Sequence, residues 1–486
     1  MMKQIRIITL AFVMALSSVA TAQFISPVDF MRNNPRSVSA NPAFYTPDYG
    51  YFDFLLGGFN LGIQNIGLKY KNFFRFDANG QPVVLDLNQG VASLNDENYI
   101  NTYFSLDVFN CGRRTNYGYV TFWHRIREVE SFSYSKDLME LLVHGNSAFL
   151  GADNPADINI GVSARAFQEF ALGYQMSLTE QLNIGLRFKF LMGFIDAKTN
   201  DLNIKLYTDP KTYELNLMAS ADINGNLPYP MEIDDGFMPQ ILDGRFNVAN
   251  LFKNYGFGVD LGAEYMINDH FGLAAAVNDL GYIKWNNYAL NYNGGLEDNG
   301  SYYVDGAISF SGVTEEQVNA LINNPDDLSG LADELMGYLN VEGACVPFYK
   351  TGLNANFMLR GYYNINPKHR LSVQYTGYNL GLGVKPATTL AYTGSFSDRY
   401  DLVATYTMMP GSYNNLGVGL SANLGGLLLF VATNNVLAFF NPANSGAMSV
   451  QMGLSFTSGT LIDRSETVVV GKTSKVLIEE DDDDEW

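Results

Sequence analysis

The most regular hydrophobic pattern in the chain spans residues 182–194. Every second position there is a large apolar residue: Leu182, Ile184, Leu186, Phe188, Phe190, Met192 and Phe194. Arg187 and Lys189 lie among the positions between them. Because a β-strand points successive side chains to opposite faces, this pattern predicts a strand with one hydrocarbon face and one polar face. The run is longer than the roughly 9–11 residues that cross a bilayer at a tilt. We therefore expect lipid on one side of the strand and water or polar protein on the other.

The same alternation recurs along the chain, and short polar turns join many of these segments into hairpins. Candidate strands cover residues 52–63, 68–76, 103–109, 117–124, 170–178, 182–194, 255–266, 271–277, 353–360, 371–376, 400–408, 416–420 and 448–456. Bacterial membrane barrels have an even number of strands. We predict an all-β fold, a closed antiparallel transmembrane β-barrel of about 14 strands, within a range of roughly 12 to 16.

Composition favours this fold over a secreted soluble β-sandwich, whose strands also alternate. Charged residues make up only 16% of the chain, against roughly 25% in soluble proteins, whereas Phe (33), Tyr (30) and Gly (46) are abundant. Lipid-facing surface carries few charges, and aromatic residues gather at membrane interfaces. The formal charge of −20 argues against binding to nucleic acid, whose phosphates it would repel.

The N-terminus has the pattern of a secretory signal peptide over residues 1–22. Lys3 and Arg6 precede an apolar stretch at 7–16, and small residues at 20–22 predict cleavage after Ala22. The longest later apolar run, at 427–432, is far shorter than the ~20 residues of a spanning helix. These features predict an outer-membrane protein with an N-terminal hatch or plug at 23–50 and a barrel at 51–457.

Connections of unequal length predict short periplasmic turns at one end of the barrel and long extracellular or lumenal loops at the other. Long connections are expected at 128–158, 197–254, 285–301 and 311–349. Helical spacing appears within two of them, at about 135–149 and about 314–340. Either helical segment would cap the barrel or fold into its lumen.

The last part of the chain, 458–486, is polar and contains seven consecutive acidic residues before Trp486. Such a run repels itself, so we predict a disordered periplasmic tail. Three roles stay open for it: a solvated end, a docking arm for a basic periplasmic partner, or a loose calcium ligand.

Charged residues on the polar faces of the strands are candidates for the lumen. They are Glu169, Arg187, Lys189, Asp260, Glu264 and Arg360. They would line a channel or hold the carboxylate of a ligand, as charged rings do in pores. Alternatively they pair with one another and fill the interior, and in the hairpin of residues 168–195 Glu169 falls near Lys189.

Residues for catalysis or metal binding are sparse. The four histidines have no metal-ligand spacing, and the chain has neither a nucleophile elbow nor a phosphate-binding loop. The segment from His144 to Ser147 offers residue types used by an outer-membrane phospholipase, but neighbours in one loop seldom converge as a catalytic group. We expect no enzyme activity, no cofactor and no metal site.

Two resemblances add to this interpretation. The segment Ser39-Ala40-Asn41-Pro42-Ala43-Phe44 resembles the hatch motif of long-chain fatty-acid transporter (FadL-like) barrels, which makes Asn41, Pro42, Ala43 and Phe44 hatch candidates. The segments 135–149, 169–174 and 278–285 look like those of an uncharacterised Bacteroidota family of predicted outer-membrane barrels, over about residues 23–457. The first resemblance implies a gated transport barrel, and the second implies location and fold alone.

Two functions of different classes follow. In the first, the barrel binds or passes a hydrophobic or small amphipathic molecule across the outer membrane, with the hatch as gate. In the second, a plugged barrel anchors a secretion or cell-surface complex. The expected partners are outer-membrane lipid, a hydrophobic small molecule, and a periplasmic or surface protein that binds the acidic tail or the loops.

Overall fold

The computed structural model describes residues 25–458 except 45–48, 56, 77–81, 212–214, 228–230, 233–239, 242–251, 287–288, 296, 299–300, 303–340, 398 and 442–444. The predicted signal peptide, the helix predicted over 314–340 and residues 459–486 of the acidic tail lie outside the described residues.

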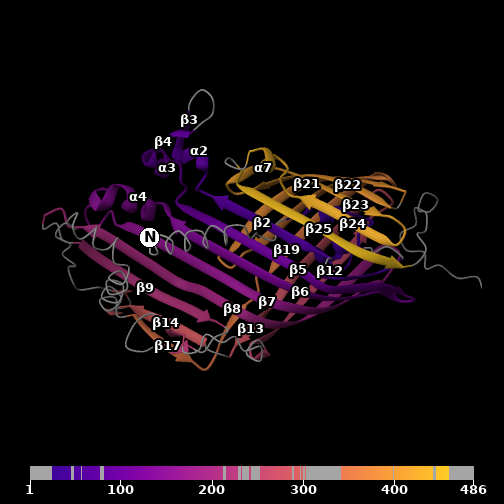
Figure 1. Cartoon of the computed structure of the whole chain (residues 1–486), viewed down its shortest axis with the longest axis horizontal. Coiled ribbons are helices and arrows are strands. Elements are labelled where there is room, and N and C mark those ends of the chain that lie inside the picture. Colours follow the sequence, from indigo (N-terminus) through magenta and orange to yellow (C-terminus); the bar gives the residue numbers. More distant parts are fainter. Residues whose placement is uncertain are drawn as a thin grey trace, which may run out of the picture.

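Fourteen antiparallel strands close into a barrel (Figure 1). Strands β1 (Gly50–Phe54) and β2 (Phe59–Ile66) together form the first position of the wall, which continues through β5 (Glu97–Thr115), β6 (Gly118–Ser135), β7 (Ala156–Ser177), β8 (Leu182–Thr208), β12 (Tyr255–Met266), β13 (Phe271–Trp285), β19 (Asn356–Asn366), β20 (His369–Asn379), β21 (Val384–Phe396), β22 (Tyr400–Met409), β23 (Ser412–Asn423), β24 (Leu427–Thr433) and β25 (Ala447–Ser458). β25 closes the ring by pairing with β1 and β2, with Phe456 opposite Phe52. The predicted closed barrel and its strand number are confirmed.

The two faces of the wall differ as the alternation predicts. On β8, Phe188 and Phe190 are 57% and 41% exposed on the outside, whereas Arg187 and Lys189 are buried inside. The other wall strands likewise place large apolar side chains outward. An apolar outer belt around a polar interior is the surface that a bilayer covers. Among the residues that the structure describes, no helix is long and apolar enough to cross a membrane.

Strands β5 to β8 are much longer than the alternation predicts. β6 continues to Ser135 and β8 to Thr208, through segments predicted as loops, and β9 (Leu215–Asn226) pairs with the second half of β8. The outward face of β6 beyond Ile126 carries Glu128 and Glu130. The strand therefore continues past the apolar belt, where hydrogen bonding maintains it but amphipathic alternation no longer marks it. Short strands β14 (Ala289–Gly295), β17 (Val341–Val346) and β18 (Tyr349–Gly352) extend the same part of the wall.

Helical and small β elements lie at the end of the barrel that carries the long connections (Figure 1). α4 (Lys136–His144) and η3 (Gly145–Ala148) confirm the helix predicted over about 135–149. The strand predicted over 68–76 is wrong: α2 (Tyr70–Phe73) and β3 (Phe74–Phe76) stand there, and β3 pairs with β4 (Pro82–Leu85) outside the wall, before α3 (Leu87–Ala92). The remaining described elements are β10 (Met231–Glu232), β11 (Gln240–Ile241), β15 (Glu297–Asp298), β16 (Ser301–Tyr302) and α7 (Leu437–Phe440).

The segment before β1 folds inside the barrel. Residues 25–44, which we call the plug, contain two short 3-10 helices, η1 (Pro27–Phe30) and η2 (Pro35–Ser39). Each begins with a proline behind a capping residue, Ser26 or Asn34, whose side chain accepts a backbone N–H. Nearly all plug side chains are buried. The plug therefore fills part of the lumen as a compact, internally capped unit.

Candidate functional site

The lumen contains three connected features: the plug contacts, an ionic cluster on the wall, and a cavity beside the plug. The first plug contact is made by Arg36 of η2. Its Nη2 lies 2.6 Å from Asp53 Oδ2 on β1, and its Nη1 pairs with Asp107 on β5. Both carboxylates are almost fully buried. A buried cation on the plug is therefore neutralised by two acids of the wall.

The hatch residues contact the opposite side of the wall. Asn41 Nδ2 donates to the carbonyl oxygens of Ala263 (3.1 Å) and Ala275 (3.2 Å) on β12 and β13. Its Oδ1 accepts from Ala43 N at 2.8 Å, which turns the plug back on itself. Gly262 allows this approach, because a Cβ there would overlap the Asn41 side chain. Asn41 thus fastens the turn of the hatch motif to two neighbouring strands.

Phe44, the last residue of the plug, contacts one of the predicted lumen charges. The Arg360 guanidinium carbon lies 4.5 Å from the ring centroid of Phe44 and 4.0 Å from that of Phe30. The same guanidinium donates to Asp29 O (3.0 Å) and to Gln374 Oε1. Arg360 therefore joins the two ends of the plug to β19 and β20 through cation–π and hydrogen-bond contacts.

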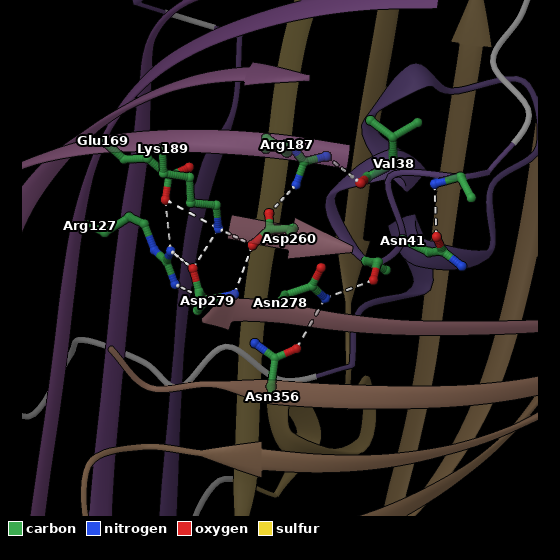
Figure 2. Close-up of polar contacts among 12 residues, drawn as sticks. Val38, Asn41, Arg127, Glu169, Arg187, Lys189, Asp260, Asn278, Asp279 and Asn356 are labelled. Atoms are coloured by element: carbon green, nitrogen blue, oxygen red, sulfur yellow. Dashed lines mark hydrogen bonds and ion pairs between the residues drawn. The ribbon is translucent and has the colours of Figure 1, made fainter. Parts of the chain in front are cut away.

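Six charged side chains form a closed ionic cluster on β6, β7, β8, β12 and β13 (Figure 2). Lys189 Nζ lies 2.5 Å from Asp279 Oδ1 and 2.7 Å from Asp260 Oδ1. Arg127 Nη1 lies 2.9 Å from both Glu169 and Asp279, and Arg187 Nη1 lies 2.7 Å from Asp260 Oδ2. Three cations balance three carboxylates, and every one of these side chains is at most 5% exposed.

A bulge in β13 explains how Asp279 joins the cluster. The register between β12 and β13 shifts at this point, so that Asn278 and Asp279 both stand opposite Asp260 and both are buried. Asp279 has a positive φ of 59°, a conformation that Asp tolerates better than most residues, and its N–H donates to Asp260 Oδ1 at 2.7 Å. The extra residue turns two consecutive side chains inward, which a regular strand cannot do.

The ionic cluster touches the plug at one point that Figure 2 shows. Arg187 Nη2 donates to Val38 O at 2.6 Å. The Trp123 ring lies between Arg187 and Arg125. The guanidinium carbon of Arg187 is 3.9 Å from the ring centroid, and that of Arg125 is 4.2 Å from it. The cluster is therefore a part of the wall against which the plug rests.

A cavity of about 130 Å³ lies between the plug and the wall. Its plug side includes Ile25, Val28, Asp29 and Arg36. On the wall, polar residues such as Arg125, Arg127 and Asn278 lie in the same lining as apolar Tyr103, Val129, Tyr378, Leu380 and Phe430. The cavity is thus amphipathic, and the plug forms one of its surfaces.

The six predicted lumen residues all face inward, but they do not form one site. Glu169, Arg187, Lys189 and Asp260 meet in the ionic cluster, and Lys189 lies 3.7 Å from Glu169. Glu264 instead accepts from the hydroxyl of Tyr362 at 2.9 Å, and Arg360 contacts the plug. For the four clustered residues, mutual pairing is the interpretation that the geometry supports.

Several inward charges were missed, among them Asp53, Asp107, Arg125, Arg127 and Asp279, and also the buried pair of Arg165 and Asp196. Asp53 and Asp107 follow Phe52 and Leu106, and Ile126 lies between the two arginines. A charge that alternates with large apolar residues is expected on the inner face. The sequence therefore contains this signal for Asp53, Asp107, Arg125 and Arg127. For Asp279, the signal was the three-residue step from Val277 to Leu280, which indicates a bulge.

The catalytic interpretation of the loop at His144 has no geometric support. His144 Nδ1 lies 2.7 Å from Glu140 Oε1 and Nε2 lies 2.6 Å from Asn88 Oδ1, whereas the Ser147 hydroxyl contacts the main-chain oxygen of His144. Within the part of the chain that the structure describes, no group of three or more His, Cys, Asp or Glu side chains is placed to hold a metal ion.

Comparisons with known proteins identify relatives of the sequence and of the fold. The sequence matches DUF5723, described as a family of unknown function, over residues 42–434. No curated protein matches it.

Three solved structures are similar to the fold. The toluene transporter TodX of Pseudomonas putida has a TM-score of 0.35 and 8% identity, covering 90% of this chain and 95% of that one. A Pseudomonas aeruginosa FadL homologue has a TM-score of 0.37 and 11% identity, covering 89% and 94%. The toluene transporter TbuX of Ralstonia pickettii has a TM-score of 0.30 and 8% identity, and the match covers 87% of this chain and 93% of that one. All three TM-scores are below 0.5, so the function of this chain has to be inferred from its own lumen. The Bacteroidota origin stays a prediction.

Proposed function

The chain belongs to DUF5723, a family of unknown function, and from its lumen we propose that it is an outer-membrane barrel that binds a hydrophobic or small amphipathic molecule beside its plug and passes it across the membrane. The observation that carries this proposal is the amphipathic cavity whose surface the plug shares with the wall. A molecule held there touches plug and wall together. Movement of the plug would open a path from that position.

The plug contacts are consistent with a gate. They are hydrogen bonds, ion pairs and ring contacts at separate points of the wall, at Arg36, Val38, Asn41 and Phe44. In the described residues between 25 and 44, the chain has no covalent link to the wall apart from its own continuation into β1. Such contacts break and re-form without damage to the barrel, because the hydrogen bonds of the wall do not depend on them.

Retention of small molecules tests the binding part of the proposal. The full chain is purified from outer membranes, and the bound lipids and small molecules are identified by mass spectrometry. Thr376→Trp places bulk in the cavity, and Thr388→Trp on the neighbouring strand β21 places it on the lipid face. We expect wild type and Thr388→Trp to retain the same amphiphiles and Thr376→Trp to lose them. Identical retention in all three proteins would contradict the proposal.

The transport part needs a flux measurement. The amphiphile that wild type retains is added outside proteoliposomes, and its entry is followed with time. We expect faster entry than in liposomes without protein and a return to that background rate with Thr376→Trp. Binding without flux would favour a receptor or anchor over a transporter.

A role as an assembly anchor is the second candidate. The observation that favours it is the extension of β5 to β8 beyond the apolar belt, which offers a tall outer face to a protein partner. Large proteins that co-purify with the chain, and vanish when residues 458–486 are deleted, would support it. If no protein co-purifies, the anchor role is rejected.

A further inference from the structure

Polar and apolar residues occupy different depths of the cavity. On β5 and β6, Asp107 stands opposite Arg125, Ser105 opposite Arg127, and Tyr103 opposite Val129. These three pairs follow one another away from the short turn that joins the two strands. On these two strands the lining therefore changes from charged to apolar with distance from the short-turn end, which we call the deep end of the cavity. A bound molecule would place its polar end there.

The same gradient appears across the cavity on β20. Gln374, Thr376 and Tyr378 line it in this order, again starting from the short-turn end. Leu380 continues the series after the strand ends. The lining on β5, β6 and β20 thus favours an occupant with its hydrocarbon part toward the end of the barrel that carries the long connections, whereas on β19 the order is reversed, with Met358 nearer the short turn than Asn356.

Arg125 is the guanidinium with donors to spare at the deep end. Its Nε forms an ion pair with Asp107 Oδ1 at 3.2 Å, but the two atoms are not aligned as a hydrogen bond. No described residue accepts a hydrogen bond from the Arg125 guanidinium. Asp107 is shared with Arg36. Of the charged residues that line the cavity, Arg127 is balanced within the ionic cluster, and Arg36 and Arg125 together face Asp107 and the adjacent Asp53, so the charge around Arg125 is balanced while its N–H donors stay unused. A guanidinium in such a place binds a carboxylate or phosphate strongly.

Two amide oxygens at the cavity have no donor within the described part of the chain. Asn278 Nδ2 donates to Ala40 O (2.9 Å) and Asn356 Oδ1 (3.2 Å), so its Oδ1 is fixed on the other side of the amide and is buried without a partner (Figure 2). Asn60 Oδ1 is likewise buried and unpartnered. Buried acceptors are normally satisfied, and an N–H or O–H of an occupant would do this.

We propose that the cavity takes an amphiphile whose polar end combines one anionic group with an N–H or O–H donor, bound with that end deep at Arg125. N-acyl amino acids have this chemistry, whereas hydrocarbons and alcohols lack the anion and plain fatty acids lack the donor beside it. This inference rests on the proposed function, since it names the class of molecule that the same cavity binds.

Isothermal titration of the full chain in nanodiscs, corrected for empty nanodiscs, tests this preference. The probes are N-lauroylglycine, laurate and methyl laurate, which share a hydrocarbon tail and lose first the donor and then the charge. We expect each step to weaken binding by about tenfold, the factor that 1.4 kcal/mol represents. Equal affinities for all three would overturn the inference and leave the proposed function standing. No binding of any probe would reject both.

Variants assign the recognition to residues. Arg125→Gln should remove the preference for laurate over methyl laurate, and Arg125→Lys should restore part of it. Asn60→Ala should reduce the preference for N-lauroylglycine over laurate and leave the laurate affinity unchanged. Arg370→Gln is the control, because Arg370 lies in the lumen but outside the cavity lining. Heat-modifiable migration on gels verifies that each barrel is folded. Unchanged preferences in Arg125→Gln would overturn the role of Arg125.

Discussion

Replacement of Arg36 by alanine should loosen the plug while leaving the barrel closed. In the docked plug, Arg36 pairs with Asp53 and Asp107, and all three side chains are at most 9% exposed. Without Arg36, Asp107 keeps its contact with Arg125, and Asp53 keeps the side chains of Asn110 and Ser455 as donors. No cation then remains beside Asp53 among the contacts that the structure describes.

The size of the effect follows from this incomplete compensation. Removing one partner of a buried ion pair typically destabilises by about 3–5 kcal/mol. Because both carboxylates keep some partners, we expect the lower end, about 3 kcal/mol. Each 1.4 kcal/mol is a factor of ten, so the population of undocked plug should rise by roughly a hundredfold. The wall strands do not rely on Arg36 for their pairing, so the barrel should keep its thermal stability.

Two measurements detect the undocked plug. Proteolysis of the reconstituted protein should cut within residues 25–44 in Arg36→Ala and not in wild type, and ion conductance in planar bilayers should rise. Asp53→Asn combined with Arg36→Ala should recover most of the protection, because the stranded charge is gone. Arg370→Ala removes a lumen arginine that does not contact the plug through any described hydrogen bond and serves as control. Unchanged proteolysis and conductance in Arg36→Ala would refute the reasoning.

Three further predictions concern the hatch, the ionic cluster and pH. Gly262→Val should displace Asn41 and expose the plug to proteolysis, whereas Gly361→Val should not, because a Cβ at Gly361 meets only Leu273 at 3.7 Å. Lys189→Met should lower the free energy of unfolding by about 3–5 kcal/mol in denaturant titrations, since it leaves three buried carboxylates to two arginines, whereas Lys385→Met, which breaks a more exposed pair with Glu97, should change it by less than about 1 kcal/mol. Burial raises the pKa of Asp29 to about 6, so its ionised form disfavours docking above that pH and this penalty disappears as the pH falls from about 6 toward 4. The protection factors of the plug amides in hydrogen exchange, which correct for the intrinsic pH dependence of exchange, should therefore rise on acidification in wild type, with a smaller rise in Asp29→Asn; an equal change in both would reject this assignment.

The barrel was predictable because lipid imposes a rule on every wall strand. Where the outside must be apolar, alternation marks the strand, as in residues 182–194 and 255–266. The rule ends at the edge of the belt. Glu128 and Glu130 face outward on β6, and because the outer face there is no longer apolar, the sequence pattern predicts a loop where the strand continues. At 68–76 the alternation belongs to a helix and a short hairpin outside the wall.

The lumen was predictable in part, because inward charges can be recognised, and so can a pair within one hairpin such as Glu169 and Lys189, but partners on distant segments cannot. Strand periodicity placed Arg187, Lys189 and Asp260 inside, and the hatch motif placed Asn41 near the wall. The partners of Arg36 lie 17 and 71 residues away in sequence, and which acids they are depends on the path of the plug through the barrel. Periodicity carries no information about that path.

Arg36 connects the plug to the charge of the cavity. The ionic cluster belongs to the wall, contains equal numbers of cations and carboxylates, and would keep that balance if the plug left. The charges of Arg36, Asp53 and Asp107 would change if the plug left, because the cation is on the plug and the two acids are on the wall. Departure of the plug therefore removes a positive charge from beside Arg125 and leaves two carboxylates there. The charge beside Arg125 thus depends on the position of the plug, and Arg36 is the residue that makes it so.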